Sequence, residues 1–317
     1  MKSGFLCGGA SLILCDTHAD TLYVRAMHPE RPCDVTKEKA ARGGVSVQTL
    51  ALYVGGSPAL PDIARAFAGM FAQAEALEAS GWKRIGDYRD AREGECAFLL
   101  SVEGCDLLGE DPSLLSLWRK KGVRMAALCW NYENALGTPA VRDQDAPLTP
   151  FGREAVKEML RLGIAPDVSH LNRRGFRDLT DMGIAPIASH SCCAALCPHP
   201  RNLTDDQLKA LFSAEGYVGV NFYPLFLDAR GRAGLDTVCR HVLHMLDLGG
   251  EGRVGFGSDF DGIEKKPRGL AGPQDFPALL RALEKRGVTG DLLRGIAGEN
   301  LLRYYDRIDP KPERKKE

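Results

Sequence analysis

A histidine and two acidic residues stand where the first apolar run of the sequence ends, in "LILCDTHADT" (12–21). Side chains alternate along a strand, so Asp16, His18 and Asp20 would share one face. Imidazole and carboxylate groups together suit zinc and related divalent ions. This stretch therefore predicts His18 and Asp20 as metal ligands at a strand end. Asp16 lies deeper in the run, and we expect it to bond the backbone or orient His18.

Similar residues close four later apolar runs: Glu103 after "LLSV", His170 after "APDVS", His190 after "APIAS" and Asp259 after "GFGS". A single histidine at a strand end is more often a hydrogen-bonded packing residue than a ligand. Burying this many charged groups together would, however, be costly unless something compensates them. Their joint placement predicts a transition-metal site with donors for two ions.

Eight apolar runs have the length and composition of strands, and amphipathic segments separate them. The predicted strands are Leu12–Thr17, Val45–Val54, Cys96–Val102, Val123–Cys129, Ile164–Ser169, Ile184–Ser189, Tyr217–Phe222 and Arg253–Ser258. No Gly-rich phosphate turn follows the first run, so we expect an α/β fold of the (β/α)8 TIM-like barrel type, not an open doubly wound sheet. Two extra C-terminal helices follow the eighth strand. In such a barrel the candidate ligands would meet at one mouth.

The domain organisation is expected to be simple, because no linker, internal repeat or low-complexity block interrupts the pattern. We predict a single barrel domain over residues 1–317, with a core at about 12–308 and a solvated tail at 309–317. The 41 basic and 42 acidic residues give a net charge of -1. This balance offers no overall field for nucleic acid or an anionic membrane, and it favours a small-molecule substrate.

The expected compartment is the cytoplasm. Ten cysteines are scattered along the chain, several inside apolar runs, which favours a reducing environment. The N-terminal segment is a poor signal peptide, and no apolar stretch reaches the roughly 18–20 residues that span a bilayer. Of the remaining histidines, His241 and His244 are three apart on a predicted helix, where we expect them on an exposed face.

Several motifs together resemble one known family. In order along the chain they are "DTHAD", "SVEG", "TPFGREAVKEMLRLGIAPDVSH", "SHS", "RNLTDDQL", "VNFYP", "GFGSDFDG" and "GENLLR". This series is similar to that of the renal or membrane dipeptidases and their bacterial relatives, zinc peptidases whose barrel is related to that of the amidohydrolases. The resemblance runs from about Leu12 to Tyr305.

The resemblance implies a role for each matching residue. His18 and Asp20 would hold one zinc ion, His170 and His190 the other, and Glu103 would bridge the two. The implied cofactor is thus two Zn²⁺ per chain, with other divalent ions as alternatives. Arg201 matches the residue that binds the substrate carboxylate, Asp259 matches the aspartate that handles the proton, and Tyr223 of "VNFYP" falls at a substrate-contacting position.

One position departs from the animal enzymes and resembles the bacterial branch. Where those enzymes have a substrate-contacting histidine after the fourth strand, this chain reads "LCWNYENALG", with Trp130 at the aligned place and Asn131 next to it. The hydrogen bond of that histidine to the substrate carbonyl or oxyanion is therefore missing. Asn131 is considered as its substitute.

The expected function is that of a metallo-dipeptidase, in which a hydroxide bridging the two ions attacks the peptide carbonyl. Tolerance of a D-residue at the carboxyl side is a further family implication. Two alternatives stay open. The first is another amidohydrolase-type enzyme acting on N-acyl amino acids, lactams or lactones, and the second is an inactive homologue that binds peptides. Relatives are often dimers, so a homodimer is also considered.

Overall fold

The computed structural model describes residues 12–56 and 59–309. Eight parallel strands close into a barrel because β2 pairs with both β1 and β4, where Val47 is opposite Cys15 and Ala97. The barrel strands are β1 (Cys15–Asp16), β2 (Val47–Tyr53), β4 (Ala97–Glu103), β5 (Val123–Ala127), β6 (Ala165–Asp167), β7 (Ile187–Ser191), β8 (Tyr217–Val220) and β9 (Val254–Phe256). All eight predicted strands are thus confirmed, and the fold is the predicted (β/α)8 barrel.

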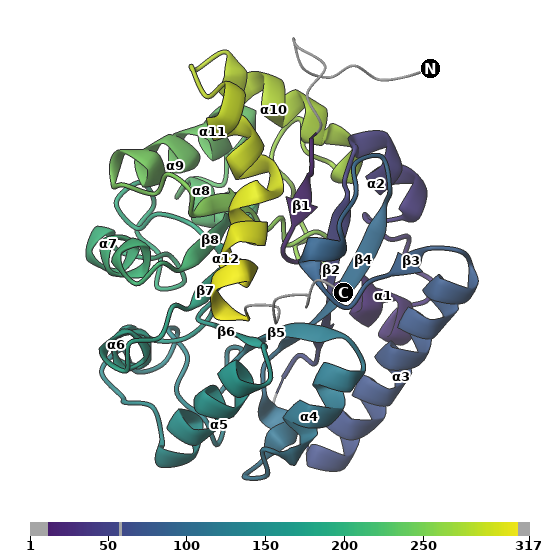
Figure 1. Ribbon diagram of the computed structural model, residues 1–317, viewed down its shortest axis with the longest axis vertical. Helices are drawn as coiled ribbons and strands as arrows, with labels where there is room; N and C mark the ends of the chain where they lie inside the picture. The colour runs from purple at the N-terminus through teal and green to yellow at the C-terminus, as the bar shows by residue number, and fades with distance from the viewer. Residues whose placement is uncertain (1–11, 57–58, 310–317) are drawn as a thin grey trace, which may run out of the picture.

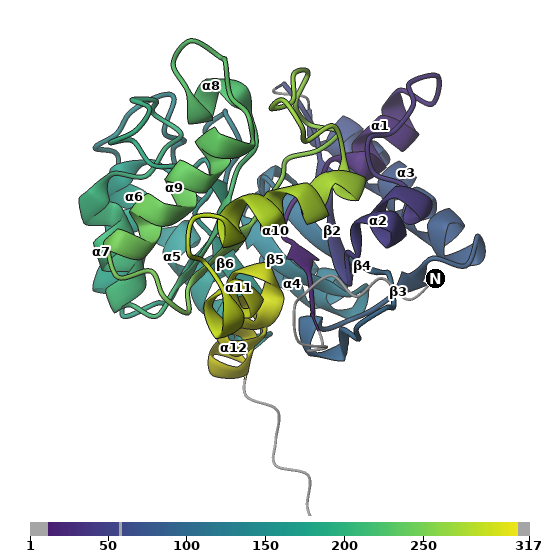
Figure 2. The ribbon, with the colours of Figure 1, turned by 90° about the horizontal axis from the view of Figure 1, so that it is seen from above.

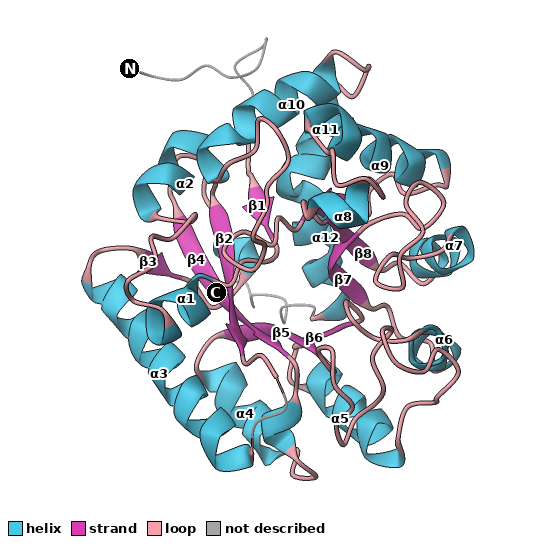
Figure 3. Ribbon diagram, turned by 180° about the vertical axis from the view of Figure 1, so that it is seen from behind, coloured by secondary structure: helices cyan, strands magenta, loops and turns pink. Residues whose placement is uncertain are grey.

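Helices surround this barrel (Figures 1 and 3). They are α1 (Thr21–Met27), α2 (Lys37–Gly43), α3 (Leu60–Ala79), α4 (Ser113–Lys120), α5 (Pro150–Arg161), α6 (Arg173–Asp181), α7 (Asp205–Ser213), α8 (Pro224–Leu227), α9 (Leu235–Asp247), α10 (Phe276–Glu284), α11 (Gly290–Arg294) and α12 (Asn300–Ile308). Threonines cap two of these helices: the Thr149 hydroxyl accepts a hydrogen bond from Gly152 N, and Thr204 forms a capping box with Gln207.

The structure adds detail that the sequence pattern did not predict. A two-residue strand, β3 (Lys83–Arg84), pairs with the start of β4 outside the closed barrel. The last predicted helix is interrupted by a π-helical turn, Gly295–Glu299, between α11 and α12. A Cβ at Gly298 in this turn would collide with the Ile13 carbonyl, so the turn packs directly on the chain entering β1.

The two ends of the barrel differ in character. Figure 2 shows α1 and α8 at one end, where the strands finish, and α12 at the other. We call these ends the mouth and the base. At the base, Tyr88 and Tyr305 stack with ring centroids 4.7 Å apart, and the Tyr305 hydroxyl donates to the Arg124 carbonyl. Asp309, the first residue of the predicted tail, accepts a hydrogen bond from Arg124; the rest of that tail lies outside the described residues.

Candidate metal centre

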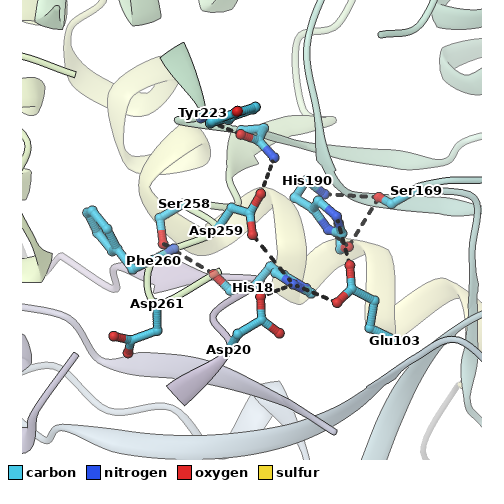
Figure 4. Close-up of polar contacts among 12 residues, drawn as sticks. His18, Asp20, Glu103, Ser169, His190, Tyr223, Ser258, Asp259, Phe260 and Asp261 are labelled. Atoms are coloured by element: carbon cyan, nitrogen blue, oxygen red, sulfur yellow. Dashed lines mark hydrogen bonds and ion pairs between the residues drawn. The ribbon is translucent and has the colours of Figure 1, made fainter. Parts of the chain in front are cut away.

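Six predicted site residues meet at the mouth, and they come from the ends of five strands or from the residues that follow those strands. Figure 4 labels all of them except His170. His18 and Asp20 follow β1, Glu103 is the last residue of β4, and His170 follows β6. His190 lies in β7, and Asp259 follows β9. The chain brings these side chains together because parallel strands of a barrel all end on the same side.

Three donor atoms form a tight triangle on one side of this cluster. His170 Nε2 lies 2.8 Å from Glu103 Oε1, His190 Nε2 lies 3.3 Å from the same oxygen, and the two nitrogens are 3.1 Å apart. Ligands of a tetrahedral ion with bonds of 2.0–2.1 Å are separated by about 3.3 Å. The spacing of these three atoms therefore fits a single metal ion.

The other Glu103 oxygen faces a second group of donors. His18 Nε2 lies 3.6 Å from Glu103 Oε2 and 3.6 Å from Asp20 Oδ2. Asp259 Oδ1 is 4.0 Å from the same nitrogen, so the donor atoms of His18, Asp20 and Asp259 also lie within metal-binding range of one another. Glu103 thus points one oxygen at each group, which is the arrangement expected of a bridging carboxylate.

The electrostatics of the cluster favour a bound cation. Burial, together with the nearby Glu103 carboxylate, raises the pKa of Asp20 to about 7 and that of Asp259 to about 6. Burial disfavours the His18 imidazolium, yet the Glu103 and Asp20 carboxylates raise the pKa of His18 well above 6.5. His18 Nε2 and Asp20 Oδ1 are buried without a hydrogen-bond partner. Unpartnered buried donors next to carboxylates are suited to a divalent metal ion.

The orientation of His190 is fixed by a chain of hydrogen bonds that runs below the site. Ser189 Oγ lies 2.5 Å from Asp167 Oδ2 and 2.7 Å from His190 Nδ1. The carboxylate can only accept, so the serine hydroxyl donates to Asp167 and His190 Nδ1–H donates to the serine oxygen. Nε2 is then the unprotonated nitrogen and faces the donor triangle. Ser189 and Asp167 were not predicted as site residues, although Asp167 precedes His170 much as Asp16 precedes His18.

His170 is oriented by a neutral partner instead. Its Nδ1–H donates to Asn131 Oδ1 at 2.9 Å, which leaves Nε2 free for the donor triangle. Asn131 also lines the cavity described below, as does Trp130, whose ring centroid is 6.1 Å from that of His170. The role of Asn131 as a substitute oxyanion donor stays a prediction, and the structure adds that its oxygen holds a histidine.

The backbone around Asp259 is unusual. Asp259 and His170 have positive φ angles of 65° and 73°, in the left-handed region that only a few non-glycine residues adopt. The Asn221 amide donates to Asp259 Oδ2 at 2.9 Å, and Asn221 Oδ1 in turn accepts from the backbone N–H of Tyr223.

Below the site, the Asp16 carboxylate accepts from the backbone N–H groups of His18 and Ser258. This agrees with the expectation that Asp16 bonds the backbone near His18.

Arg201 reaches the cluster from the segment after β7. Its Nη2 donates to His190 Nε2 at 3.0 Å, the side chain is buried, and Nε has no hydrogen-bond partner. Among the residues that the structure describes, no carboxylate lies within ion-pair distance of this guanidinium. Its rear face packs on Phe226, with the guanidinium carbon 5.6 Å from the ring centroid. A buried guanidinium that lacks a carboxylate partner and lies beside the candidate metal ligands is suited to bind an anionic group.

The expectation for His241 was wrong. His241 is fully buried, because α9 packs this face against the segments that carry the site. Its Nδ1 accepts from Cys193 N at 3.1 Å, so Nε2–H donates to the Leu227 carbonyl at 3.0 Å. His241 therefore links the segment after β7 to the end of α8. His244, as expected, lies nearer the surface, where it contacts Asp205.

A cavity of about 440 Å³ opens over the cluster, which is within the usual size range for small-molecule sites. All four residues predicted to contact substrate line it: Trp130, Asn131, Arg201 and Tyr223. Asp20, Glu103, His170 and Asp259 form its floor. Over the residues described, none of the helices combines the length and the apolar character needed to cross a membrane.

Comparison with known proteins gives consistent matches. The chain is 37% identical over 212 residues to an uncharacterized dipeptidase from Schizosaccharomyces pombe, covering 65% of this chain and 52% of that protein. It is 33% identical over 224 residues to the dipeptidase tcpJ from Claviceps purpurea, covering 69% and 52%. The chain thus spans about half the length of these curated relatives. They are fungal, so placement in the bacterial branch stays a prediction.

A solved structure matches nearly the whole chain. It is a metallopeptidase from Rhodobacter sphaeroides liganded with a phosphinate mimic of the dipeptide L-Ala-D-Ala. The TM-score is 0.86 at 26% sequence identity, covering 94% of this chain and 100% of that one. The family model described as membrane dipeptidase, peptidase family M19, matches residues 10–316. The chain therefore belongs to the membrane dipeptidase family, peptidase family M19.

Proposed function

We propose that this protein is a dipeptidase that uses two divalent metal ions and that these ions are zinc. His170, His190 and Glu103 Oε1 would hold one ion, and His18, Asp20 and Glu103 Oε2 the other. When bound, such ions lower the pKa of water toward 7 and polarise a carbonyl oxygen, which supplies a nucleophile and an electrophile at neutral pH. Family membership and the two donor groups sharing Glu103 support this proposal.

The observation that carries the choice of substrate is Arg201. Its buried guanidinium lies 3.0 Å from a metal-ligand nitrogen and lacks a carboxylate partner among the described residues. A substrate carboxylate bound there would place the adjoining peptide carbonyl over the donor cluster. This spacing suits the short distance between the terminal carboxylate and the peptide bond of a dipeptide.

Asp259 is proposed to move the proton. Burial and the Glu103 carboxylate raise its pKa to about 6, close to the value that favours proton transfer near neutral pH. Asn221 holds one oxygen of the carboxylate, and the other points toward His18. The free oxygen would accept a proton from the attacking water and deliver it to the departing amine.

An Arg201→Ala variant tests the assignment of the substrate carboxylate. We expect kcat/KM on a free dipeptide to fall by at least about 100-fold, the size typical of losing a buried charged contact. The loss on the matching dipeptide amide should be much smaller, because the amide has no carboxylate for Arg201 to bind. Steady-state kinetics on both substrates measures this, and equal losses on the two would remove the assigned role.

A substrate panel separates the alternatives. The metal donors would serve hydrolysis of an N-acyl amino acid, a lactam or a lactone equally well, whereas Arg201 favours any substrate with a free carboxylate. Dipeptides should be the best substrates in a panel containing all four classes. The panel should include D-residues at the carboxyl side, because the Rhodobacter enzyme binds a mimic of L-Ala-D-Ala. Metal-loaded protein that turns over none of them would support the inactive peptide-binding homologue.

Compartment and assembly are also proposals. The nine cysteines in the described part of the chain are free thiols, and most are buried, which supports a reducing compartment such as the cytoplasm. A homodimer is proposed because relatives in the family are often dimers. Light scattering of the purified protein would decide between monomer and dimer.

A further inference from the structure

Three aromatic side chains form one side of the cavity. Tyr23 belongs to α1, Tyr53 is the last residue of β2, and Trp130 follows β5 by three residues. The ring centroids of Tyr23 and Tyr53 are 5.0 Å apart, and those of Tyr53 and Trp130 are also 5.0 Å apart. Both pairs meet edge to face. All three line the cavity and are partly exposed. We call these three residues the aromatic wall.

The wall lies across the mouth from Arg201. Around the barrel the strands follow the order β1, β2, β4, β5, β6, β7, β8, β9. Tyr23 and Tyr53 follow or end β1 and β2, and Arg201 follows β7, which is four places from β2 in a ring of eight. Trp130 follows β5, midway between β2 and β7, so the wall extends from the side opposite Arg201 toward the donors. Figures 2 and 3 show α1, which carries Tyr23, facing α8, which carries Phe226 beside Arg201.

The metal donors lie between these two sides. Glu103 pairs in register with Tyr53 on the wall side, and His190 contacts Arg201 on the other. A dipeptide with its carboxylate at Arg201 and its peptide carbonyl over the donors must direct its amino-terminal residue toward the wall. We infer that the aromatic wall is the subsite for the side chain of the amino-terminal residue and that it selects aromatic or large aliphatic side chains. This inference rests on the proposed function.

The wall has the chemistry of an apolar subsite. Burial and the Glu103 carboxylate raise the pKa of Tyr53, so its phenol stays neutral. Val141, an exposed valine on the same cavity, adds apolar surface. Gly104, with φ of 92°, packs closely on Trp130, because a Cβ added to this glycine would lie 3.4 Å from Trp130 Cβ. Aromatic rings prefer edge-to-face or offset contacts with other rings, which a benzyl side chain can supply here.

The test compares Phe-Ala with Gly-Ala, which differ only in the amino-terminal side chain. For the wild-type protein we expect kcat/KM to be about 10 to 100-fold higher for Phe-Ala, the range expected from burying a large apolar side chain. Tyr23→Ala and Trp130→Ala should each lower this ratio by about 5-fold or more, and Trp130→Phe should retain most of it. Leu117→Ala, an exposed apolar residue on α4 away from the mouth, is the matched control and should leave the ratio unchanged.

Two results would overturn the inference. One is a wild-type protein that hydrolyses Gly-Ala as well as Phe-Ala. The other is a pair of wall variants that are folded by circular dichroism and lower both activities equally, which would show a structural role only. If Trp130→Ala does not fold, Tyr23→Ala decides the matter, because the ring contacts of Tyr23 are with His28 and Tyr53, neither of which is a proposed metal donor.

A binding measurement separates failure of this inference from failure of the proposed function. Calorimetry would compare Phe-Ala and Gly-Ala on the metal-free protein, in which neither peptide is turned over. Tighter binding of Phe-Ala that is lost in Tyr23→Ala supports the wall even if no dipeptide is hydrolysed. Equal binding of the two peptides contradicts it, whatever the activity.

Discussion

At the base of the barrel Arg89 and Arg124 pair with Asp87 and Asp309, whereas at the mouth three carboxylates face one arginine. Arg124 lies 2.8 Å from Asp309 and Arg89 lies 2.5 Å from Asp87, while Arg89 is also 3.6 Å from the exposed Asp306, so both arginines have carboxylate partners within the chain. At the mouth Asp20, Glu103 and Asp259 gather around Arg201 and around His18, whose pKa the Glu103 and Asp20 carboxylates raise although burial opposes it. The carboxylates of the base are thus paired within the chain, whereas the carboxylate cluster at the mouth favours a bound cation.

The largest expected effect is at the residue that joins the two donor groups. Glu103→Ala removes an oxygen from each group, so both ions should bind weakly and kcat/KM on dipeptides should fall by more than about 1000-fold. Metal content after dialysis, together with dipeptide kinetics, measures this. Glu95→Ala removes a surface carboxylate that pairs with Lys83, and it should change neither. A Glu103→Ala protein with full metal content would contradict the bridging role.

Asp259 should separate metal binding from turnover. Asp259→Asn keeps the shape of the side chain and its contact with Asn221 but cannot take up the proton. We expect kcat to fall by about 100 to 10,000-fold, while both ions are retained. Undiminished turnover would contradict the proton-transfer role. Loss of metal would show instead that Asp259 is a metal ligand, which the 4.0 Å distance between Asp259 Oδ1 and His18 Nε2 allows.

Substitutions at the base should change the stability of the protein and not its activity. Arg124→Met leaves Asp309 and Asp87 with less compensation, and we expect the free energy of unfolding to fall by about 3 kcal/mol, with kcat per folded molecule unchanged. Arg161→Met, which breaks an exposed pair with Glu158, is the control and should cost less than about 1 kcal/mol. Denaturant unfolding and kinetics on both variants would check this contrast. A large drop in kcat for Arg124→Met would break it.

The base should also be sensitive to acid. Partial burial tends to raise the pKa of Asp87, but hydrogen bonds from Arg89 outweigh burial and lower this pKa below its usual value. A carboxyl group with a lowered pKa in the folded state stabilises the fold above its unfolded value of about 3.9, and this contribution is lost as the pH falls through the folded value. Stability of the wild-type protein should therefore decline below about pH 4, more steeply than that of an Asp87→Asn variant.

The smallest effect is expected from the hydrogen-bond chain under His190. Ser189→Ala removes the link between His190 Nδ1 and Asp167, so the imidazole is less firmly held in the tautomer that binds metal. Metal affinity should weaken by about 10 to 100-fold, as is usual when such partners are lost. Competition with a chelator measures the affinity directly. Ser169→Ala, which removes the hydroxyl that accepts from His190 N but leaves the ring partner, should have a smaller effect.

The sequence predicted the barrel and the clustering of the candidate metal donors at its mouth because both depend on local patterns. Apolar runs marked the eight strands, and each donor stands where a run ends. What it did not predict depends on contacts between distant segments. Ser189 and Asp167 are 22 residues apart, and their bond is set by the pairing of β6 with β7. Likewise, the packing of α9 that buries His241 cannot be seen in the spacing of two histidines on one helix.

The most direct test of the central claim is the metal content of the purified wild-type protein, measured by mass spectrometry alongside its activity on dipeptides. We predict two divalent ions per chain, and we expect the activity to disappear when a chelator removes them and to return when they are restored. Protein that contains no metal and hydrolyses dipeptides at the full rate would contradict it.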